Sequence, residues 1–282
     1  MIRLNHLVRS PELRILRLDH QPDTEHSDPE EEVCSNYAIN FVEAGSFGLA
    51  TKRETWTLSP GCVFISQPGA VHHYSHHEPI PSDICLSVIY SGLLTYETDS
   101  RDSFVPRNLP TAIPPSNRLA FLRLRLIENA NDDYSMGLEH CAYEIASAVS
   151  ASTPSVKRLY SDRQLKWYAE RVESVCRIFE TRYAEPHTLS FLARSVGMSA
   201  FQFARVFAEL VGKPPHHYLI GVRLDRAAEM LLDGRTVTEA CYEVGFANLS
   251  HFTRSFTRKF GCVPSLLRSR RGAQQIALKK KI

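Results

Sequence analysis

The apolar and polar positions in the C-terminal part of the chain follow the period of helices separated by short turns. Turn residues mark the breaks, because glycine readily ends a helix and a polar side chain caps the next one. Ser199 and Asn248 are the caps that we predict after two such glycine turns. The pattern predicts helices over residues 165–183, 188–195, 200–211, 215–233, 236–243, 249–260 and 264–270.

Two stretches of this helical region, residues 189–207 and 237–256, repeat one design. Each has a short helix with a small residue, a glycine turn, and a second helix with an arginine between two aromatic residues. The matching positions are Ala193 and Cys241, Gly197 and Gly245, Phe203 and Phe252, Phe207 and Phe256, and Arg205 and Arg254. We expect the aromatic side chains to be buried and the arginines to point outward. This design is typical of helix-turn-helix units, whose second helix lies in the major groove of DNA.

A longer helix, predicted over residues 215–233, joins the two repeats. A helix of about 19 residues spans roughly 28 Å. Major-groove faces on one side of a duplex lie about 34 Å apart. The length therefore favours two recognition helices that are held one DNA turn apart, and two repeats are stronger evidence for DNA binding than one would be.

Charge is distributed unevenly along the chain. Residues 1–156 contain 11 Lys and Arg against 20 Asp and Glu, whereas residues 157–282 contain 22 against 11. A basic half suits a polyanion, because each phosphate that is neutralised releases condensed counterions. Charge alone fits a solvated basic surface equally well, so it supports the helix-turn-helix interpretation without deciding it.

The N-terminal half has short apolar runs of strand length between turns that contain glycine and proline. Many short strands with such turns predict a small antiparallel barrel or sandwich. The acidic segment 21–33 is predicted to be a loop, and the proline-rich segment 106–116 a connector. The apolar runs are Tyr37–Val42, Trp56–Leu58, Cys62–Ile65 and Ile84–Tyr90.

Two amphipathic helices are predicted after the connector, over residues 117–130 and 134–151, with Asn117 as the cap of the first. Such a pair can form a dimer interface or cover its own barrel, and both interpretations stay open. The expected domains are the barrel over residues 1–114, the helical pair over 115–151, an interdomain linker over 152–164 and the DNA-binding domain over 165–282.

Several motifs in the helical region are specific to one family. They are Gly212–Leu219 (GKPPHHYL), Arg223–Ala227 (RLDRA), Leu231-Leu232, Glu239, Glu243–Phe246 (EVGF), Ser250–Phe256 (SHFTRSF) and Phe260–Ser265 (FGCVPS). With these motifs the region resembles the AraC/XylS family of transcription regulators. Ala240-Cys241 stands where the family usually has Ile-Ala, and Phe203 where leucine is usual, but both positions stay apolar. The resemblance implies an α+β multidomain protein, with a cupin-like antiparallel β-barrel and following helices before two helix-turn-helix units joined by a linker helix.

The same resemblance implies which side chains face DNA. Arginine can form two hydrogen bonds to guanine and glutamine two to adenine, while Phe201 and Ala204 can contact thymine methyl groups. Partial burial of Phe201 and phosphate contacts by the arginines are the open alternatives. The base-facing positions are Phe201, Gln202, Ala204, Arg205, Leu249, Ser250, His251, Thr253 and Arg254. Lys213, Arg235, Arg258 and Lys259 are the phosphate contacts that we expect, and such contacts position a protein without reading sequence.

Residues 58–72 resemble the second motif of cupin barrels, and such a barrel is the usual sensor domain of this family. Cupin enzymes hold their metal with an HxH pair and a glutamate in the first motif. The corresponding region, residues 45–56, contains no histidine, and only His72 matches a ligand position. We therefore expect no metal site of the usual cupin type, no cofactor and no oxygenase chemistry.

A cluster of four histidines lies within residues 72–77. Alternation along a strand would send positions 72, 74 and 76 to one face and positions 73 and 77 to the other. Three interpretations stay open: a metal or pH sensor, a site at the barrel mouth for a small organic effector, and histidines without a binding role. The predicted effector-binding residues are His72, His73, Tyr74 and His76.

Other chemistry is less well supported by the sequence. GxSxG, HExxH and glycine-rich phosphate-binding motifs are missing, so we predict no enzyme. No apolar run approaches the roughly 18 residues of a membrane helix, and no export signal is recognised. The seven cysteines are widely spaced, which is typical of reduced thiols in the cytosol.

We predict a cytoplasmic, sequence-specific transcription regulator, in which an effector shifts the population of conformations. Its expected partners are double-stranded DNA, RNA polymerase, a small-molecule effector and a second copy of the chain. The alternatives are a metal- or pH-responsive regulator that uses residues 72–77, a cupin-type metal-binding enzyme fused to a DNA-binding domain, and an effector-free regulator controlled by its abundance. A barrel filled by side chains would favour the last of these.

Overall fold

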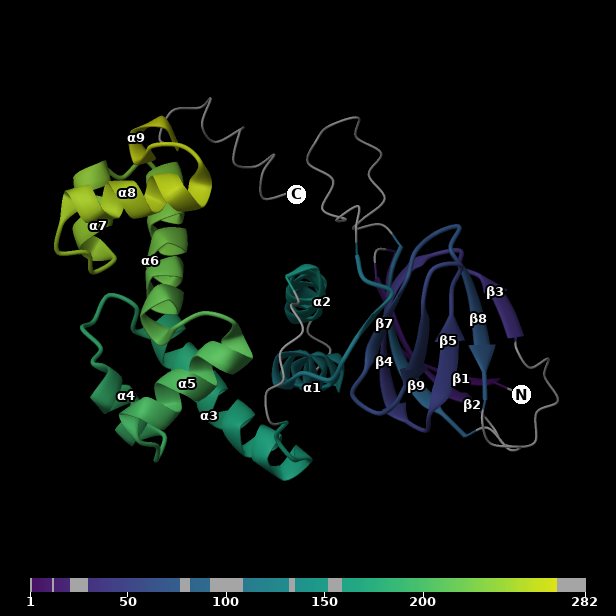
Figure 1. Cartoon of the computed structure of the whole chain (residues 1–282). Helices are drawn as coiled ribbons and strands as arrows, with labels where there is room; N and C mark the ends of the chain where they lie inside the picture. Colours follow the sequence, from purple (N-terminus) through teal and green to yellow (C-terminus); the bar gives the residue numbers. More distant parts are fainter. Residues whose placement is uncertain are drawn as a thin grey trace. The chain divides into compact units, whose positions relative to one another are not determined.

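The computed structural model describes residues 2–11, 13–20, 30–76, 82–91, 109–131, 135–151 and 159–267. The chain divides into two compact units, Met1–Ser161 and Asp162–Ile282 (Figure 1). The first contains strands followed by two helices, and the second is helical. No helix within the described ranges is long and apolar enough to cross a lipid bilayer.

The strands described in the first unit form two antiparallel sheets. The larger sheet has the order β1-β2-β9-β4-β7-β10, and the smaller has the order β3-β8-β5-β6. The strands are β1 (Ile2–Arg9), β2 (Leu13–His20), β3 (Glu30–Val33), β4 (Tyr37–Ala44), β5 (Phe47–Ala50), β6 (Thr55–Leu58), β7 (Val63–Ser66), β8 (Val71–Ser75), β9 (Ile84–Tyr90) and β10 (Ala112–Ile113), and the helices that follow are α1 (Asn117–Asn131) and α2 (Ser135–Ser150).

Apolar side chains from both sheets meet in the core of the first unit. In the larger sheet, β4 is buried along most of its length, with Ile39 and Phe41 almost inaccessible to water. Phe47 of β5 and Phe64 of β7 bring the two sheets into contact, with ring centroids 5.9 Å apart. Burial of these side chains stabilises strands that are too short to persist alone.

Helices α1 and α2 pack on the larger sheet of their own chain. The hydroxyl of Tyr90, at the end of β9, donates a hydrogen bond to the carbonyl oxygen of Ala142 in α2 at 2.8 Å. Glu43 of β4 forms ion pairs with Arg123 of α1 and with Arg17 of β2. The polar contacts therefore anchor each helix to the sheet.

The fold class is confirmed, but the closed barrel is a wrong prediction. In the described residues no ladder of hydrogen bonds joins the two sheets, so the unit is a sandwich. The smaller sheet has its own edges, because β8 pairs with β3 and β5 and not with a strand of the larger sheet. The strands β1, β2 and β5 were missed, since polar residues interrupt the apolar patterns of β1 and β2, and β5 is a run of only four residues.

Other local predictions need correction. Residues 30–33 of the predicted loop form β3, because they pair with β8, and residues 21–29 lie outside the described residues. Two residues of the proline-rich connector, Ala112 and Ile113, add β10 to the edge of the larger sheet. Ser116 caps α1, since its Oγ accepts from the backbone of Leu119 at 3.2 Å. The side chain of Asn117 instead accepts from the backbone of Tyr160 at 2.8 Å.

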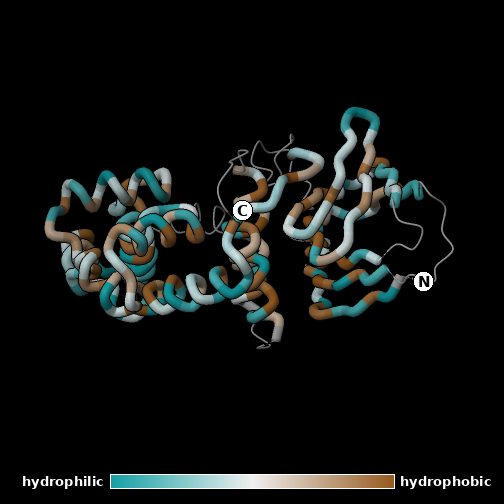
Figure 2. The backbone as a smooth tube through the Cα atoms, turned by 60° about the horizontal axis from the view of Figure 1, so that its bottom comes forward, coloured by the Kyte–Doolittle hydropathy of each residue, from teal (hydrophilic) through white to brown (hydrophobic). Residues whose placement is uncertain are grey.

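The second unit contains the helices that the sequence pattern predicts, with ends that differ by a few residues. Hydrophobic and hydrophilic residues are interspersed along these helices, as Figure 2 shows. Residues 162–164 belong to the first helix and not to a linker, and residues 268–270 of the last predicted helix lie outside the described residues. The helices are α3 (Asp162–Thr181), α4 (Leu189–Ser195), α5 (Ala200–Val211), α6 (Pro215–Leu232), α7 (Val237–Glu243), α8 (Leu249–Phe260) and α9 (Pro264–Leu267).

Each helix-turn-helix unit has an apolar core of its own at one end of α6 (Figure 1). The predicted caps are present, because the side chains of Ser199 and Asn248 accept from backbone N–H groups at the starts of α5 and α8. The four predicted aromatic side chains are fully buried, and the small residue of each short helix is also buried. These residues are Phe203, Phe207, Phe252, Phe256, Ala193 and Cys241.

The two glycine turns differ in their surroundings although both have left-handed backbones. Gly197 has φ +66° and nothing within 4 Å of a side chain added to it. Gly245 has φ +88°, and a Cβ there would lie 2.5 Å from the carbonyl oxygen of Ala184. The second turn therefore packs directly against the loop between α3 and α4.

We predict that Gly245→Ala destabilises the helical unit more than Gly197→Ala does. The left-handed backbone alone should cost about 1–2 kcal/mol at either position. The clash with Ala184 should bring the loss at position 245 to at least about 3 kcal/mol. Urea unfolding followed by Trp167 fluorescence in a Trp56→Phe background measures both, and equal losses would contradict the contact.

Candidate functional site

The outer face of α5 presents the side chains that were predicted to read bases in the first helix-turn-helix unit. Phe201 is 80% exposed, and Arg205 is exposed as well. Ala204 is half-buried. Gln202 is also half-buried, and its Nε2 donates to the hydroxyl of Tyr168 in α3 at 3.1 Å. Gln202 would therefore have to break its hydrogen bond to Tyr168 before it could contact a base. No such bond has to be broken for Phe201, Ala204 or Arg205.

The outer face of α8 presents the second set. Ser250, His251 and Arg254 are exposed and Leu249 is 38% exposed, whereas Thr253 is half-buried. The Nε of Arg254 donates to the carbonyl oxygen of Ser250 one turn earlier at 3.3 Å, which orients the guanidinium along the helix. No acidic residue occurs between α8 and the end of the chain. This face is therefore polar, basic and accessible.

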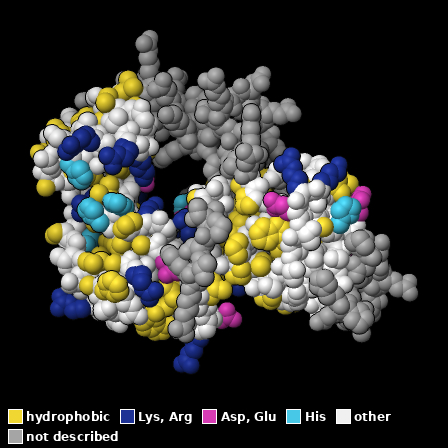
Figure 3. Space-filling view, in the orientation of Figure 1, with side chains coloured by type: hydrophobic (Ala, Val, Ile, Leu, Met, Phe, Trp, Pro, Cys, Tyr) yellow, Lys and Arg dark blue, Asp and Glu magenta, His cyan; other side chains and the backbone are white. Residues whose placement is uncertain are grey.

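The predicted phosphate contacts differ in how available they are. Lys213, Arg235 and Arg258 are exposed. The ammonium of Lys259 is bound within the protein, since it donates to Asp225 at 2.6 Å and to the carbonyl oxygen of Gly221 at 2.9 Å. In Figure 3, Lys, Arg and His side chains gather on the upper part of the helical unit. Lys259 therefore fixes α8 to α6, whereas the other three are the cations open to an anionic partner.

Arg223 of α6 joins the two helix-turn-helix units. Its guanidinium donates to the carbonyl oxygens of Tyr183 at 2.7 Å, Glu185 at 2.9 Å and Gly245 at 2.8 Å. The first two acceptors belong to the loop before α4, and the third lies in the turn before α8. Burial lowers the pKa of Arg223, although an arginine stays protonated at neutral pH. One side chain thus sets the position of one recognition helix relative to the other.

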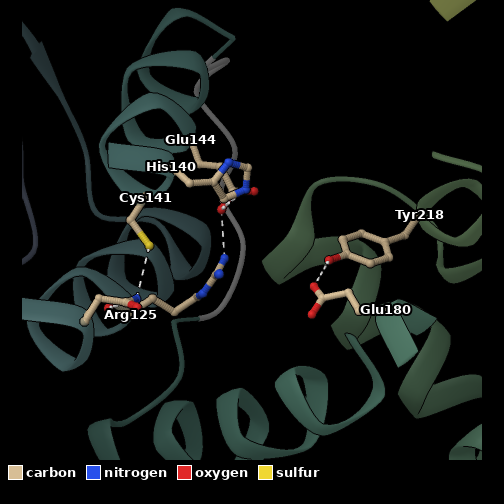
Figure 4. Close-up of polar contacts among 7 residues, drawn as sticks. Arg125, His140, Cys141, Glu144, Glu180 and Tyr218 are labelled. Atoms are coloured by element: carbon tan, nitrogen blue, oxygen red, sulfur yellow. Dashed lines mark hydrogen bonds and ion pairs between the residues drawn. The ribbon is translucent and has the colours of Figure 1, made fainter. Parts of the chain in front are cut away.

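A second polar contact fastens α6 to α3. The hydroxyl of Tyr218 donates to the carboxylate of Glu180 at 3.2 Å, as Figure 4 shows. Burial raises the pKa of Tyr218, so the phenol stays protonated as a donor. The ring of Tyr218 packs against Phe179 and Phe207. The start of α6 is therefore fixed to the core of the first helix-turn-helix unit.

The helical pair of the first unit has its own polar contacts, which Figure 4 also shows. Arg125 of α1 pairs with Glu144 of α2 at 2.7 Å. Asn129 of α1 donates to the sulfur of Cys141 in α2 at 3.4 Å. Seven apolar side chains of the two helices are buried: Leu119, Leu122, Leu126, Leu138, Cys141, Ile145 and Val149. The pair is therefore packed within its own chain, and its role in dimerisation stays a prediction.

A cavity of about 530 Å³ lies in the first unit, with side chains from both sheets in its wall. Of the four predicted effector residues, Tyr74 and His76 line it. His72 is buried, with its Nδ1 3.2 Å from the hydroxyl of Tyr74. His73 lies 3.7 Å from Glu31. The strand alternation places positions 72 and 74 on one side as predicted, but His72 and His73 do not line the cavity, and residue 77 lies outside the described residues.

Burial lowers the pKa of His72, and the neighbouring His73 lowers it further. The ring of His72 is therefore neutral at physiological pH.

Sequence reasoning missed the polar group in the cavity wall, where Ser87 donates to Asn40 at 2.6 Å and Asn40 donates to Ser66 at 3.1 Å. An asparagine inside the apolar run 37–42 was the signal that could have revealed it.

The cavity wall carries negative charge. Its described lining residues include four carboxylates and no lysine or arginine. Two imidazoles and two thiols are the other ionisable groups near them, besides the Tyr74 hydroxyl. These groups are Glu30, Glu31, Glu32, Asp83, His20, His76, Cys34 and Cys85. The wall therefore favours a neutral or cationic ligand over an anion.

An N-terminal sandwich with a cavity, followed by two helix-turn-helix units on a common helix, defines a two-unit helix-turn-helix protein. Family models agree: the AraC-like ligand binding domain matches residues 17–107, and a helix-turn-helix domain matches residues 192–270. The chain belongs to the AraC/XylS family of transcription regulators.

Individual relatives match different shares of the chain. The virulence regulon transcriptional activator VirF of Yersinia enterocolitica is 33% identical over 97 residues, which are 34% of this chain and 36% of VirF. The chain thus spans about a third of that relative. The uncharacterized regulator YbfI of Bacillus subtilis is 24% identical over 222 residues, 76% of this chain and 78% of YbfI. A crystal structure of a probable AraC family regulator from Rhodopseudomonas palustris is 32% identical, covers 36% of this chain and 97% of that one, and has a TM-score of 0.35.

We predict that Arg223→Lys lowers the free energy of unfolding of the helical unit by about 2–3 kcal/mol. A lysine ammonium cannot span three carbonyl oxygens with the spread of a guanidinium, so at least one charged hydrogen bond is lost. Arg226→Lys on the same helix is the matched control. It retains an exposed ion pair with Glu229 and should change stability by less than about 0.5 kcal/mol. Urea unfolding compares the two variants, and equal stability would show that the Arg223 contacts are not needed.

Proposed function

We propose that this chain is a sequence-specific DNA-binding transcription regulator whose N-terminal unit binds a small effector. The observation that carries the proposal is the pair of exposed helix faces, on α5 and α8, that α6 and Arg223 hold in one unit. Two such faces are the arrangement with which helix-turn-helix proteins read two successive major grooves. The function proposed is regulatory and not catalytic.

The length of α6 supports simultaneous contact with one duplex. Its 18 residues span about 27 Å. Successive major-groove faces lie about 34 Å apart. Because α5 lies at one end of α6 and α8 at the other (Figure 1), we infer that their exposed side chains cover the remaining distance. Each helix would then contact base edges with the residues near its N-terminus.

Arg205 and Arg254 are the side chains that we propose to select guanine. Each is exposed and lies two residues after the first buried phenylalanine of its helix, Phe203 or Phe252. Phe201 and Leu249 offer apolar contacts to thymine methyl groups from the first turn of each helix. Exposed apolar side chains such as Phe201 and Leu249 lower solubility. Their exposure is therefore explained by contact with DNA.

We predict that Arg205→Ala and Arg254→Ala each weaken binding to a selected duplex by about 1–3 kcal/mol, with little loss on random duplex. The reason is that a bidentate bond to guanine is available only on the correct sequence. Fluorescence anisotropy with both duplexes measures the difference. Equal loss on both duplexes would make the arginines phosphate clamps and contradict their assignment to bases.

The exposed arginine near the end of α8 should behave differently. We predict that Arg258→Ala weakens binding to selected and random duplexes alike, and reduces the slope of log K against log salt concentration by about 1. Lys52→Ala, in the turn between β5 and β6 of the first unit, is the control and should leave the slope unchanged. An unchanged slope for Arg258→Ala would remove this residue from the phosphate contacts.

The cavity supports effector control over control by abundance alone, because a sandwich without a ligand has no need of a space of about 530 Å³. We propose that a ligand there favours one arrangement of the two units over another. Tyr74 and His76 are the proposed effector contacts among the predicted four. A cytoplasmic location, a homodimer and contact with RNA polymerase complete the proposal.

A further inference from the structure

Three side chains with metal-binding atoms converge on the cavity wall. The Nδ1 of His20 lies 3.2 Å from Oδ1 of Asp83, and the Nε2 of His76 lies 3.1 Å from the same oxygen. The three ligand atoms all lie within 4.8 Å of one another. The side chains come from the end of β2, the residue after β8 and the residue before β9, so the fold and not the local sequence brings them together.

The backbone holds the carboxylate of this group in place. The N–H of His20 donates to the carbonyl oxygen of Asp83 at 2.9 Å, which continues the pairing of β2 with β9. On the other side, the Gly45 backbone packs so closely that a Cβ there would lie 2.2 Å from the carbonyl oxygen of Ser82. Asp83 is thus fixed between two neighbouring segments before its side chain makes any contact.

The three side chains are shielded from water. The side-chain exposures are 8% for His20, 6% for His76 and 15% for Asp83. No lysine or arginine is present among the described residues that line the cavity. A shielded carboxylate needs a compensating positive charge. The two imidazoles lie within hydrogen-bond distance of the carboxylate. A metal cation bound among the three side chains would supply the positive charge.

The separations between the carboxylate oxygen and the two imidazole nitrogens suit one metal ion. Zinc lies about 2.0–2.2 Å from imidazole nitrogen and carboxylate oxygen, so two ligands of a tetrahedral ion are about 3.3 Å apart. The observed distances of 3.1 and 3.2 Å are close to that value. Two histidines and one carboxylate leave the fourth position to water or to another molecule. That position faces the cavity.

We propose that His20, His76 and Asp83 bind a divalent first-row transition metal ion of the zinc type, whose open coordination position faces the cavity. This ligand set is unlike that of cupin enzymes, because it takes neither a histidine from residues 45–56 nor His72. The carboxylates of Glu30–Glu32 in the same wall raise the local concentration of cations. The site rests on the first unit alone and does not depend on DNA binding.

The test uses the full chain after treatment with a chelator. Calorimetric titration with Zn²⁺ should show one high-affinity ion per chain, and Mg²⁺ and Ca²⁺ should not bind, because imidazole is a poor ligand for both. Co²⁺ should give the intense visible absorption of a four-coordinate ion. It should give no thiolate-to-cobalt band, although Cys34 and Cys85 line the cavity; such a band would overturn the assigned ligand set.

Substitutions then locate the ion. Asp83→Asn and His76→Gln should each weaken Zn²⁺ binding by at least about 100-fold, since losing a group that merely orients a ligand costs up to that much. His73→Ala is the control, because this histidine does not line the cavity, and it should bind Zn²⁺ like the unaltered chain. Circular dichroism without metal checks that each variant is folded.

The outcomes separate this proposal from the proposed function. Absence of Zn²⁺ binding, or binding that survives both substitutions, overturns the metal site. DNA binding by the metal-free chain is measured on the same samples with a selected duplex. A chain that binds this duplex but no Zn²⁺ refutes the metal site alone, whereas a chain that binds Zn²⁺ but no DNA refutes the regulator and leaves the metal site standing.

Discussion

The guanidinium of Arg223 connects three backbone carbonyl oxygens that belong to two separate helix-turn-helix units. Each unit has its own apolar core and its own capped recognition helix. These local features alone would not fix the orientation of one unit relative to the other. The hydrogen bonds of Arg223, the close packing of Gly245 on Ala184 and the ion pair between Lys259 and Asp225 remove that freedom. Reading two grooves together requires this constraint, because a flexible pair would lose conformational entropy on every binding event.

In the first unit, the main structural requirement is to pair the polar groups that line its cavity. Its two sheets pack through the aromatic side chains of Phe47 and Phe64, which also line a cavity with four carboxylates in its wall. Buried polar groups are stable only when they are paired, and the cavity wall satisfies this through Asn40 with Ser66 and Ser87. Among the described side chains, Asp83 is paired only with imidazoles. A bound cation would therefore stabilise the cavity wall most at this carboxylate. The proposed effector recognition and the proposed DNA reading thus rest on separate units with separate cores.

The sequence was sufficient to predict features that depend on local chemistry. Ser199 and Asn248 cap their helices, and the paired phenylalanines are buried, because caps and helical periodicity act within a few residues. Features that depend on sheet register were not predictable. His20 and Asp83 are separated by 63 positions and meet only because β2 pairs with β9. The cap of α1 was assigned one residue too late, since Asn117 bonds to Tyr160 instead. The closed barrel failed for the same reason, because local pattern does not specify which strands pair.

We propose that α5 and α8 enter two successive major grooves on one side of a duplex. Guanine-methylation interference on DNA selected by the full chain shows which guanines the protein contacts. We expect two clusters of interfering guanines on one face of the helix, about 10–10.5 base pairs apart from centre to centre. A single cluster, or two clusters on opposite faces, would refute contact with successive grooves.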